Sequence, residues 1–316
     1  MKKNISVWLT GSRGFIGKHL VQGLKNNSID YKCFSNNPSL KNKLVNIENN
    51  IFYMNFSSKE NIYEYIEEFG CPDTFIHLGW GDMTSPMSKL HLSDNVKEAE
   101  ILIETFLKVG LEKFIFLGSV NEYGSLVGRL SEEMKPKGRL INYAKGKIKV
   151  AQHGFKIADY FGKLFIHIRP FYVYGSGQRK GSLINELFEA FQNNRDTKLG
   201  PCDHFRDYIY VMDVVEGIIQ SRSINNSCTI NFGIGSFIKV KDFVTIFWEK
   251  LGGDMTKLKF GFQPMLKYEP DQPKSYADLT RLYELTQWKP TYSIEKGIEA
   301  TIDGLLKEAK DKLITN

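Results

Sequence analysis

The stretch of sequence that decides the fold is ISVWLTGSRGFIGKHL, residues 5–20. An apolar run, Ile5–Leu9, leads into glycines at positions 11, 14 and 17, and a helical pattern begins at the second glycine. In this spacing the first glycine allows a tight turn, the second lets a pyrophosphate approach the backbone, and the third lets the helix pack closely on the strand. Because a helix N-terminus also offers free N–H groups and a positive dipole end, the stretch predicts a dinucleotide-binding loop.

The end of the next expected strand indicates which dinucleotide binds. An acidic residue there holds the ribose 2′-hydroxyl of NAD, but this strand ends Cys33-Phe34-Ser35-Asn36 without a carboxylate. Arg13, inside the glycine loop, is placed to reach a 2′-phosphate, which suits a bidentate guanidinium. We therefore expect NADP(H), with NAD(H) and a solvated Arg13 as the alternatives. The cofactor contacts expected from these two segments are Gly11, Ser12, Arg13, Gly14, Phe15, Ile16, Gly17, Ser35 and Asn36.

Beyond the loop, short β-rich runs alternate with longer segments of helical period, which is typical of a parallel sheet covered on both faces. The expected strands are Ile5–Leu9, Tyr31–Phe34, Ile51–Met54, Thr74–His77, Phe114–Leu117 and Leu164–Ile168. The expected helices are Gly14–Asn26, Glu60–Phe69, Asp94–Val109 and Ile141–Phe161. This pattern predicts an α/β fold with a Rossmann-type doubly wound parallel sheet in residues 1–170.

After residue 170 the regularity loosens, and we expect a smaller mixed α/β substrate lobe in residues 171–316. Its expected elements are a helix at Ser182–Gln192, a strand at Asp207–Tyr210, a helix at Val211–Gln220, a strand-like run at Thr229–Phe232, and helices at Val240–Leu251 and Ser293–Glu308. Part of residues 211–233 is expected to return to the first domain. The lobe would pack on the carboxyl ends of the strands, where open α/β sheets bind ligands.

The composition excludes several classes of protein. Of the 316 residues 42% are hydrophobic and 25% are charged, as in an ordinary globular protein. The four cysteines show no paired spacing, so we expect no disulfide framework, no metal site and a reducing, cytoplasmic location. No apolar stretch reaches the roughly 20 residues of a membrane-spanning helix. The net charge of +6 is spread along the chain, so neither a membrane nor a nucleic acid is an expected partner.

A tyrosine and a lysine one helical turn apart indicate the chemistry. Tyr143 and Lys147 share one face of the helix expected at Ile141–Phe161. A nearby ammonium stabilises a phenolate and lowers the pKa of the tyrosine, so that it can exchange a proton with a carbinol or a carbonyl. Ser119 follows the strand Phe114–Leu117, where its hydroxyl can hydrogen-bond a substrate oxygen. The three residues are therefore candidates for catalysis.

Taken together, the motifs resemble the extended short-chain dehydrogenase/reductase family, which comprises NAD(P)-dependent nucleotide-sugar epimerases, dehydratases and reductases. The resemblance covers nearly the whole chain. The motifs that carry it are Gly11-x-x-Gly14-x-x-Gly17, His77-Leu78-Gly79-Trp80, Ser119 before Tyr123-Gly124, Tyr143-x-x-x-Lys147, Arg169-Pro170-Phe171-Tyr172-Val173-Tyr174-Gly175, Phe205-Arg206-Asp207-Tyr208-Ile209, and Ala277-Asp278 before Trp288-Lys289-Pro290.

The resemblance implies a role for each matching residue. Tyr143 would be the general acid/base, Lys147 would hold the nicotinamide ribose, and Ser119 would orient the sugar oxygen. The cofactor contacts it adds are Leu78, Gly79, Tyr143, Lys147 and Pro170. The contacts it implies for a nucleotide-diphosphate sugar are Trp80, Asn121, Tyr172 and Arg206.

Arg206 would pair with the diphosphate, the alternative being a salt bridge to Asp203 or Asp207. Where the family often has a second phosphate-binding arginine, only Lys267 is available. Tyr172 stands where the family usually has an asparagine, so that substrate contact must change.

Departures from the family narrow the reaction. The dehydratases carry an Asp-Glu pair after the serine or threonine, but Val120 and Asn121 occupy those positions and cannot transfer a proton. The segment 121–124, Asn-Glu-Tyr-Gly, looks like that of reductases in O-antigen and capsule deoxysugar biosynthesis. We expect NADPH-dependent reduction of the C4 ketone of a nucleotide-diphosphate 4-keto-6-deoxyhexose. The alternative is an NAD-dependent 4-epimerase acting on a nucleotide-diphosphate hexose.

Three further expectations concern individual segments. Glu122 either touches sugar hydroxyls or caps the turn, and His77 is structural. The stretch Asn36–Asn50 is a solvated loop from which Lys41 or Lys43 could assist a 2′-phosphate. By resemblance the chain forms a homodimer through helices 94–109 and 141–161. The apolar residues expected in its seam are Ile101, Leu102, Phe106, Ile148 and Phe155.

Overall fold

The computed structural model describes residues 6–40, 50–263 and 274–315, with side chains to residue 311. Lys41, Lys43 and Lys267, which the sequence suggested as phosphate contacts, lie outside the described residues. None of the helices in the described part combines the length and apolarity that a bilayer crossing requires.

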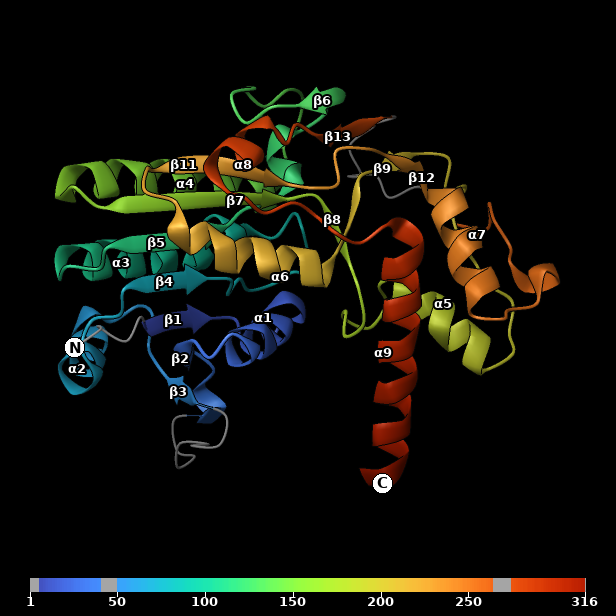
Figure 1. Cartoon of the computed structure of the whole chain (residues 1–316), viewed down its shortest axis with the longest axis horizontal. Helices are drawn as coiled ribbons and strands as arrows, with labels where there is room; N and C mark the ends of the chain where they lie inside the picture. Colours follow the sequence, from blue (N-terminus) through green and yellow to red (C-terminus); the bar gives the residue numbers. More distant parts are fainter. Residues whose placement is uncertain (1–5, 41–49, 264–273, 316) are drawn as a thin grey trace.

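A parallel seven-stranded sheet forms the centre of the molecule (Figure 1). Its strands lie in the order β11-β7-β5-β4-β1-β2-β3, and every neighbouring pair is parallel. In chain order they are β1 (Ser6–Thr10), β2 (Asp30–Ser35), β3 (Ile51–Tyr53), β4 (Thr74–His77), β5 (Lys113–Leu117), β7 (Leu164–Pro170) and β11 (Cys228–Phe232). The strand order reverses between β1 and β4, so the predicted doubly wound Rossmann-type fold is confirmed.

Helices cover both faces of this sheet because each strand presents apolar side chains on both sides. One face is packed by α1 (Phe15–Asn26) and α6 (Val211–Gln220), which contribute Leu20, Leu24 and Ile218 to an apolar core. The other face is packed by α2 (Lys59–Phe69), α3 (Asp94–Lys108) and α4 (Asn142–Phe161). The core on that side includes Phe75, Phe106 and Phe114.

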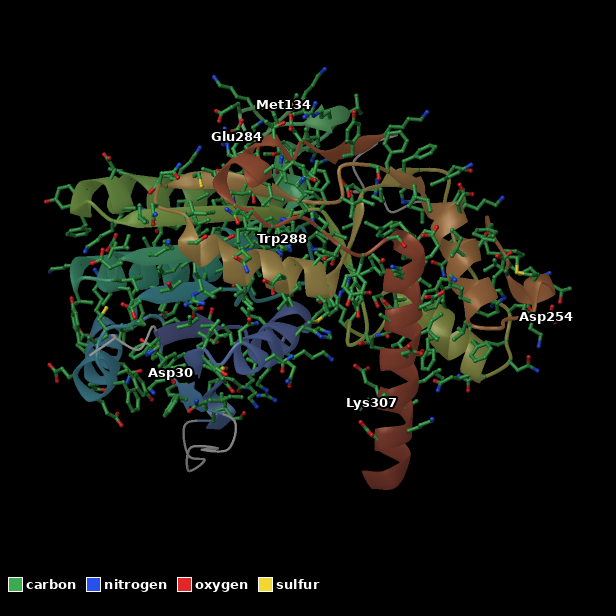
Figure 2. All side chains as sticks on the ribbon, viewed as in Figure 1. Asp30, Met134, Asp254, Glu284, Trp288 and Lys307 are labelled. Atoms are coloured by element: carbon green, nitrogen blue, oxygen red, sulfur yellow. The ribbon has the colours of Figure 1, made fainter. Side chains whose placement is uncertain are left out.

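Segment 211–233 lies with the sheet. Helix α6 packs beside α1, and β11 pairs with β7 at the sheet edge. The Trp288 side chain, marked in Figure 2, packs on Phe232 of β11 with ring centroids 5.3 Å apart. A later segment of the chain therefore also covers this sheet.

A second assembly of helices and short strands stands beside the strand ends (Figure 1). Its helices α5 (Leu183–Gln192), α7 (Val240–Lys250) and α9 (Ile294–Thr315) surround their own apolar core. The small strand pairs are β8 (Tyr172–Tyr174) with β10 (Tyr208–Tyr210), β9 (Phe205–Arg206) with β12 (Ile238–Lys239), and β6 (Gly128–Leu130) with β13 (Ser275–Ala277). The remaining elements are helix α8 (Thr280–Leu285) and the 3-10 turns η1 (Pro38–Leu40), η3 (Lys89–His91), η4 (Val120–Tyr123), η5 (Ser221–Ser223) and η6 (Met255–Lys257).

The strand predicted at Asp207–Tyr210 is present as β10, which begins one residue later, at Tyr208. Asp207 separates β9 from β10, and the two strands pair with different partners. Its buried carboxylate accepts the N–H groups of Ile234, Gly235 and Ala277 at 2.8, 3.1 and 2.9 Å. The side chain thus fastens two distant backbone segments to the start of β10.

The expected dimer seam also needs a correction. Leu102 and Phe106 are fully buried in the core between α3, α4 and the sheet, so they cannot face a partner. Ile101, Ile148 and Phe155 are half-buried. Only these three remain candidates for a surface seam on α3 and α4.

Candidate active site

The glycine loop between β1 and α1 has the geometry that its spacing predicts. Gly11 has a φ of +75°, and its carbonyl accepts the N–H of Gly14 at 3.0 Å. A side chain at Gly17 would place its Cβ 2.0 Å from the Gly11 carbonyl oxygen. The third glycine therefore lets α1 approach the loop closely.

The N-terminus of α1 is free to bind an anion. Gly14 is the N-cap, no side chain caps the helix, and the first turn carries no acidic residue. Arg13 is exposed beside it and makes no hydrogen bond or ion pair with the described residues. The uncapped helix end and the three glycines leave room for a pyrophosphate next to free N–H groups. The loop brings together the predicted contacts from Gly11 to Gly17.

A hydrogen-bond chain joins the ends of β1 and β4 beside this loop. The Thr10 hydroxyl accepts the N–H of Gly79 at 3.1 Å and lies 2.7 Å from Nδ1 of His77. Burial, helped by Lys147, lowers the pKa of His77 to about 3, so the ring is neutral near pH 7 and shares a hydrogen bond with the threonine hydroxyl. His77 is therefore structural, and it fixes the backbone of Leu78 and Gly79 next to the glycine loop.

The end of β2 holds a carboxylate that the sequence pattern did not indicate. The two contacts predicted there are half-buried Ser35 and exposed Asn36, whose neutral side chains can form hydrogen bonds. Nδ2 of Asn36 donates to Oε2 of Glu98, at 2.9 Å, although Glu98 belongs to α3. No local motif could reveal this contact, because the two residues are 62 positions apart.

Ser119 begins η4 directly after β5, and a buried acid holds its backbone. The Ser119 N–H donates to Oε1 of Glu122 at 2.8 Å, and the serine oxygen accepts the N–H of Asn121 at 3.2 Å. Glu122 also meets His167 at 3.2 Å and Arg169 at 3.1 Å. Of the two roles expected for Glu122, the structure shows the cap, and the carboxylate points away from solvent into these contacts.

Tyr143 and Lys147 lie on the face of α4 that is directed at the end of β5. Nζ of Lys147 donates to the Leu117 carbonyl at 2.7 Å and lies 3.9 Å from the centroid of the Trp80 ring. Burial lowers the pKa of Lys147 to about 7, while Glu122 acts in the opposite direction. The lysine is thus a buried amine beneath the site, held by a carbonyl and an aromatic face.

The pKa of Tyr143 differs from the expectation. We expected the lysine to lower it, but burial raises it above the ordinary value, and a hydrogen bond with Ser119 only partly offsets that effect. Nζ of Lys147 lies 5.8 Å from the Tyr143 ring centroid and is occupied by the Leu117 carbonyl. The phenol is therefore protonated near neutral pH, and Ser119 and Tyr143 place two hydroxyls together at the carboxyl end of β5.

Trp80 forms a wall of this site together with a histidine that the sequence analysis missed. The Trp80 ring lies edge-on to Tyr143 with centroids 6.2 Å apart, and His91 lies 5.5 Å from Tyr143. The indole N–H donates to Nδ1 of His91 at 3.0 Å, while Nε2 of His91 lies 3.0 Å from the Ser85 carbonyl. This pair fixes the histidine tautomer and orients the indole toward Tyr143.

The other expected substrate contacts, Tyr172 and Arg206, meet at a different place in the fold. The Arg206 guanidinium is buried and lies 4.5 Å from the centroid of the Tyr172 ring. Of the two acids considered as its partners, Asp203 pairs with Lys239 at 2.7 Å and Asp207 accepts backbone N–H groups. An aromatic face thus stands beside a planar cation of the kind that can bind a phosphate group bidentately.

A polar cavity of about 520 Å³ lies elsewhere. Its lining includes Glu132, Arg281 and Asn226 to Thr229. Residues 226–229 form the amino end of β11, opposite to the carboxyl ends where the glycine loop and Ser119 lie. The cavity therefore does not belong to the candidate active site.

Residues 7–227 match the family model described as the NAD dependent epimerase/dehydratase family, so the chain belongs to that family. It is an enzyme of the extended short-chain dehydrogenase/reductase type that uses a nicotinamide dinucleotide.

Among curated relatives, a CDP-abequose synthase of Salmonella typhimurium is 23% identical over 95% of this chain and 98% of its own. The solved UDP-glucose 4-epimerase of Thermotoga maritima, in complex with UDP-glucose, has a TM-score of 0.82 at 24% identity, covering 96% of this chain and 99% of that one. The UDP-glucose 4-epimerase of Thermus thermophilus, in complex with NAD, has a TM-score of 0.78 at 20% identity, covering 95% and 99%. At these identities the solved structures establish the shared fold.

Proposed function

We propose that the enzyme reduces the C4 ketone of a nucleotide-diphosphate 4-keto-6-deoxyhexose, with NADPH as the reductant. The observation that carries this proposal is the pair of hydroxyls, Ser119 and protonated Tyr143, at the carboxyl end of β5 with no proton-transferring side chain at positions 120 and 121. Residues 1–170 and the segment 211–233 would hold the dinucleotide, and the remaining C-terminal part would hold the sugar nucleotide.

The protonation state of Tyr143 favours the reductive direction. A ketone that receives a hydride at carbon must receive a proton at oxygen, and a protonated phenol is the form that can donate it. When bound, the reduced dinucleotide supplies the hydride. Tyr143 gives its proton to the C4 oxygen as the carbonyl π bond breaks, and the resulting alcohol carries one new C–H and one new O–H bond. Tyr143 then regains a proton from solvent.

Ser119 and Lys147 would assist this proton transfer in different ways. The Ser119 oxygen accepts the Asn121 N–H, and its hydroxyl shares a hydrogen bond with Tyr143, so it stands where it would orient the ketone oxygen. Lys147 lies below Tyr143 and would hold the nicotinamide ribose. A positive charge on its amine would favour the phenolate that forms when Tyr143 donates, although in the structure Nζ donates to the Leu117 carbonyl.

Elimination of water is not supported by these residues. Val120 and Asn121 lack an ionisable group, and the nearest carboxylate, Glu122, is fully buried and occupied by Ser119, His167 and Arg169. Dehydration needs an acid and a base that can reach the sugar. Ketone reduction needs one proton donor beside the source of hydride, and Tyr143 would be that donor.

A second candidate is an NAD-dependent 4-epimerase of a nucleotide-diphosphate hexose. The contact between Asn36 and Glu98 favours it, because it places a carboxylate near the end of β2, where NAD-binding folds have one. The similarity to two solved UDP-glucose 4-epimerases supports the same hypothesis. An epimerase returns the hydride to the opposite face of the same sugar, so the added dinucleotide is not consumed.

The test is a panel of nucleotide-diphosphate 4-keto-6-deoxyhexoses, each with NADPH or NADH, followed by nicotinamide absorbance and by NMR of the product. The reductase proposal predicts loss of NADPH absorbance with at least one ketosugar and none with the corresponding hexoses. The Tyr143→Phe variant, which keeps the ring, serves as the control. Interconversion of UDP-glucose and UDP-galactose without loss of absorbance would establish the epimerase instead.

A further inference from the structure

A carboxylate from α3 reaches the end of β2. Oε2 of Glu98 accepts the side-chain N–H of Asn36 at 2.9 Å, and Asn36 is the first residue after β2. Glu98 is half-buried, and its burial raises its carboxyl pKa, while the hydrogen bond from Asn36 acts in the opposite direction. The contact therefore holds the acid at a defined place.

That place matters because of the neighbouring strand. β2 lies beside β1 in the sheet, and β1 ends at the glycine loop. In dinucleotide-binding folds of this topology the residue that follows the second strand meets the ribose of the adenosine half. Although the sequence after β2 carries no acid, Asn36 brings the Glu98 carboxylate to within one hydrogen bond of this position.

Two opposite charges would therefore act on the position expected for the ribose 2′ group. Arg13 extends from the glycine loop without an ion pair among the described residues, and it would attract a 2′-phosphate. Glu98 would repel that phosphate and would accept a hydrogen bond from a 2′-hydroxyl. Asp94, one turn earlier on α3, adds a second negative charge facing Glu98.

We propose that Glu98 is a specificity-determining residue for the dinucleotide, which acts against Arg13 and limits the preference of the enzyme for NADPH over NADH. The proposal rests on the proposed binding of the cofactor at the glycine loop. It also assigns part of the cofactor choice to α3. Neither the glycine spacing nor the residues at the end of β2 indicate such a role for this helix.

Equilibrium fluorescence titrations of the full chain with NADH and with NADPH test the proposal, without any sugar present. Glu98→Gln keeps the size of the side chain and an acceptor for Asn36 but removes the charge. We expect it to raise the ratio of NADPH affinity to NADH affinity by about tenfold. This is the lower end of what charge-assisted hydrogen bonds contribute, because Glu98 is only half-buried.

The matched control is Glu100→Gln on the same helix. Glu100 faces Lys149 of α4 at 3.9 Å, so both dinucleotide affinities should stay unchanged. An unchanged affinity ratio in Glu98→Gln, or an equal loss for both dinucleotides, would overturn the proposal and leave Glu98 as a clamp between α3 and β2. If the titrations give the expected result but no ketosugar is reduced, only the proposed reaction is contradicted.

Discussion

The buried acid below the site offers a quantitative test of how the site is held. Glu122 has a fully buried side chain that accepts the Ser119 N–H at 2.8 Å and faces Arg169, of which 14% is exposed, at 3.1 Å. Burial lowers the pKa of His167, so its neutral ring gives Glu122 a hydrogen bond and Arg169 gives the compensating charge. Glu122→Gln removes this charge and little else.

The expected cost follows from these contacts. Removing one partner of a buried ion pair typically costs ~3–5 kcal/mol, because the other charge stays buried. The glutamine keeps an acceptor for Ser119, so we expect the lower end, a loss of about 3 kcal/mol in the free energy of unfolding. This is a large part of the ~5–15 kcal/mol that stabilises most domains. Urea denaturation followed by tryptophan fluorescence at pH 7 measures it.

The control is Glu133→Gln, because 79% of the Glu133 side chain and 29% of that of its partner Arg281 are exposed. We expect it to cost less than about 1 kcal/mol. If Glu122→Gln is as stable as the wild type at pH 7, the reasoning about the buried pair is refuted.

The pH dependence of stability has a definite sign. Burial alone would raise the pKa of Glu122, but His167 and Arg169 hold it below its ordinary value of 4.5. The charged pair therefore stabilises the fold fully above about pH 4.5 and less as the pH falls through the folded-state pKa. Glu122→Gln should lack this acid loss. In the wild type and in the variant, His167 is buried and neutral. It therefore adds a separate loss of stability, which begins as the pH falls below its ordinary pKa of 6.5.

Three further predictions concern catalysis, substrate and assembly. Tyr143→Phe should lower kcat by about 10²–10⁴-fold while NADPH still binds in titration, and near wild-type turnover would exclude Tyr143 as the acid. Arg206→Lys should raise KM for the sugar nucleotide about tenfold or more with little change in NADPH affinity, since a lysine loses the bidentate contact, whereas an unchanged KM would assign Arg206 to the fold alone. The chain should be a homodimer by light scattering at micromolar concentration, and Ile148→Asp should give a monomer, while a monomeric wild type would contradict the seam on α3 and α4.

The sequence predicted the sheet well because each strand of a covered parallel sheet is a short apolar run between helical segments. The glycine loop was equally predictable, since Gly11 and Gly17 are required by local geometry. The strand predicted at Asp207–Tyr210 was one residue too long, because the sequence pattern does not show that the Asp207 side chain binds distant backbone groups. There the buried Asp207 carboxylate and its three backbone donors decide the break.

The candidate site divides in the same way. Ser119, Tyr143 and Lys147 could be found because strand ends and helical spacing place them. Glu98 and His91 could not, because their roles arise from contacts between distant segments. Leu102 and Phe106 were misplaced for a related reason: periodicity shows that a helix has an apolar face but does not show whether the core of the same chain already covers it.

The most direct test of the proposed reaction follows the transferred atom. NADPH carrying deuterium at the transferable position of its nicotinamide is incubated with the ketosugar that responds in the panel, and the product is examined by NMR. Ketone reduction predicts deuterium at C4 of the sugar, with one dinucleotide oxidised for each alcohol formed. Interconversion of the two C4 epimers of a nucleotide-diphosphate hexose, with no deuterium incorporated and no net oxidation of the added dinucleotide, would contradict it.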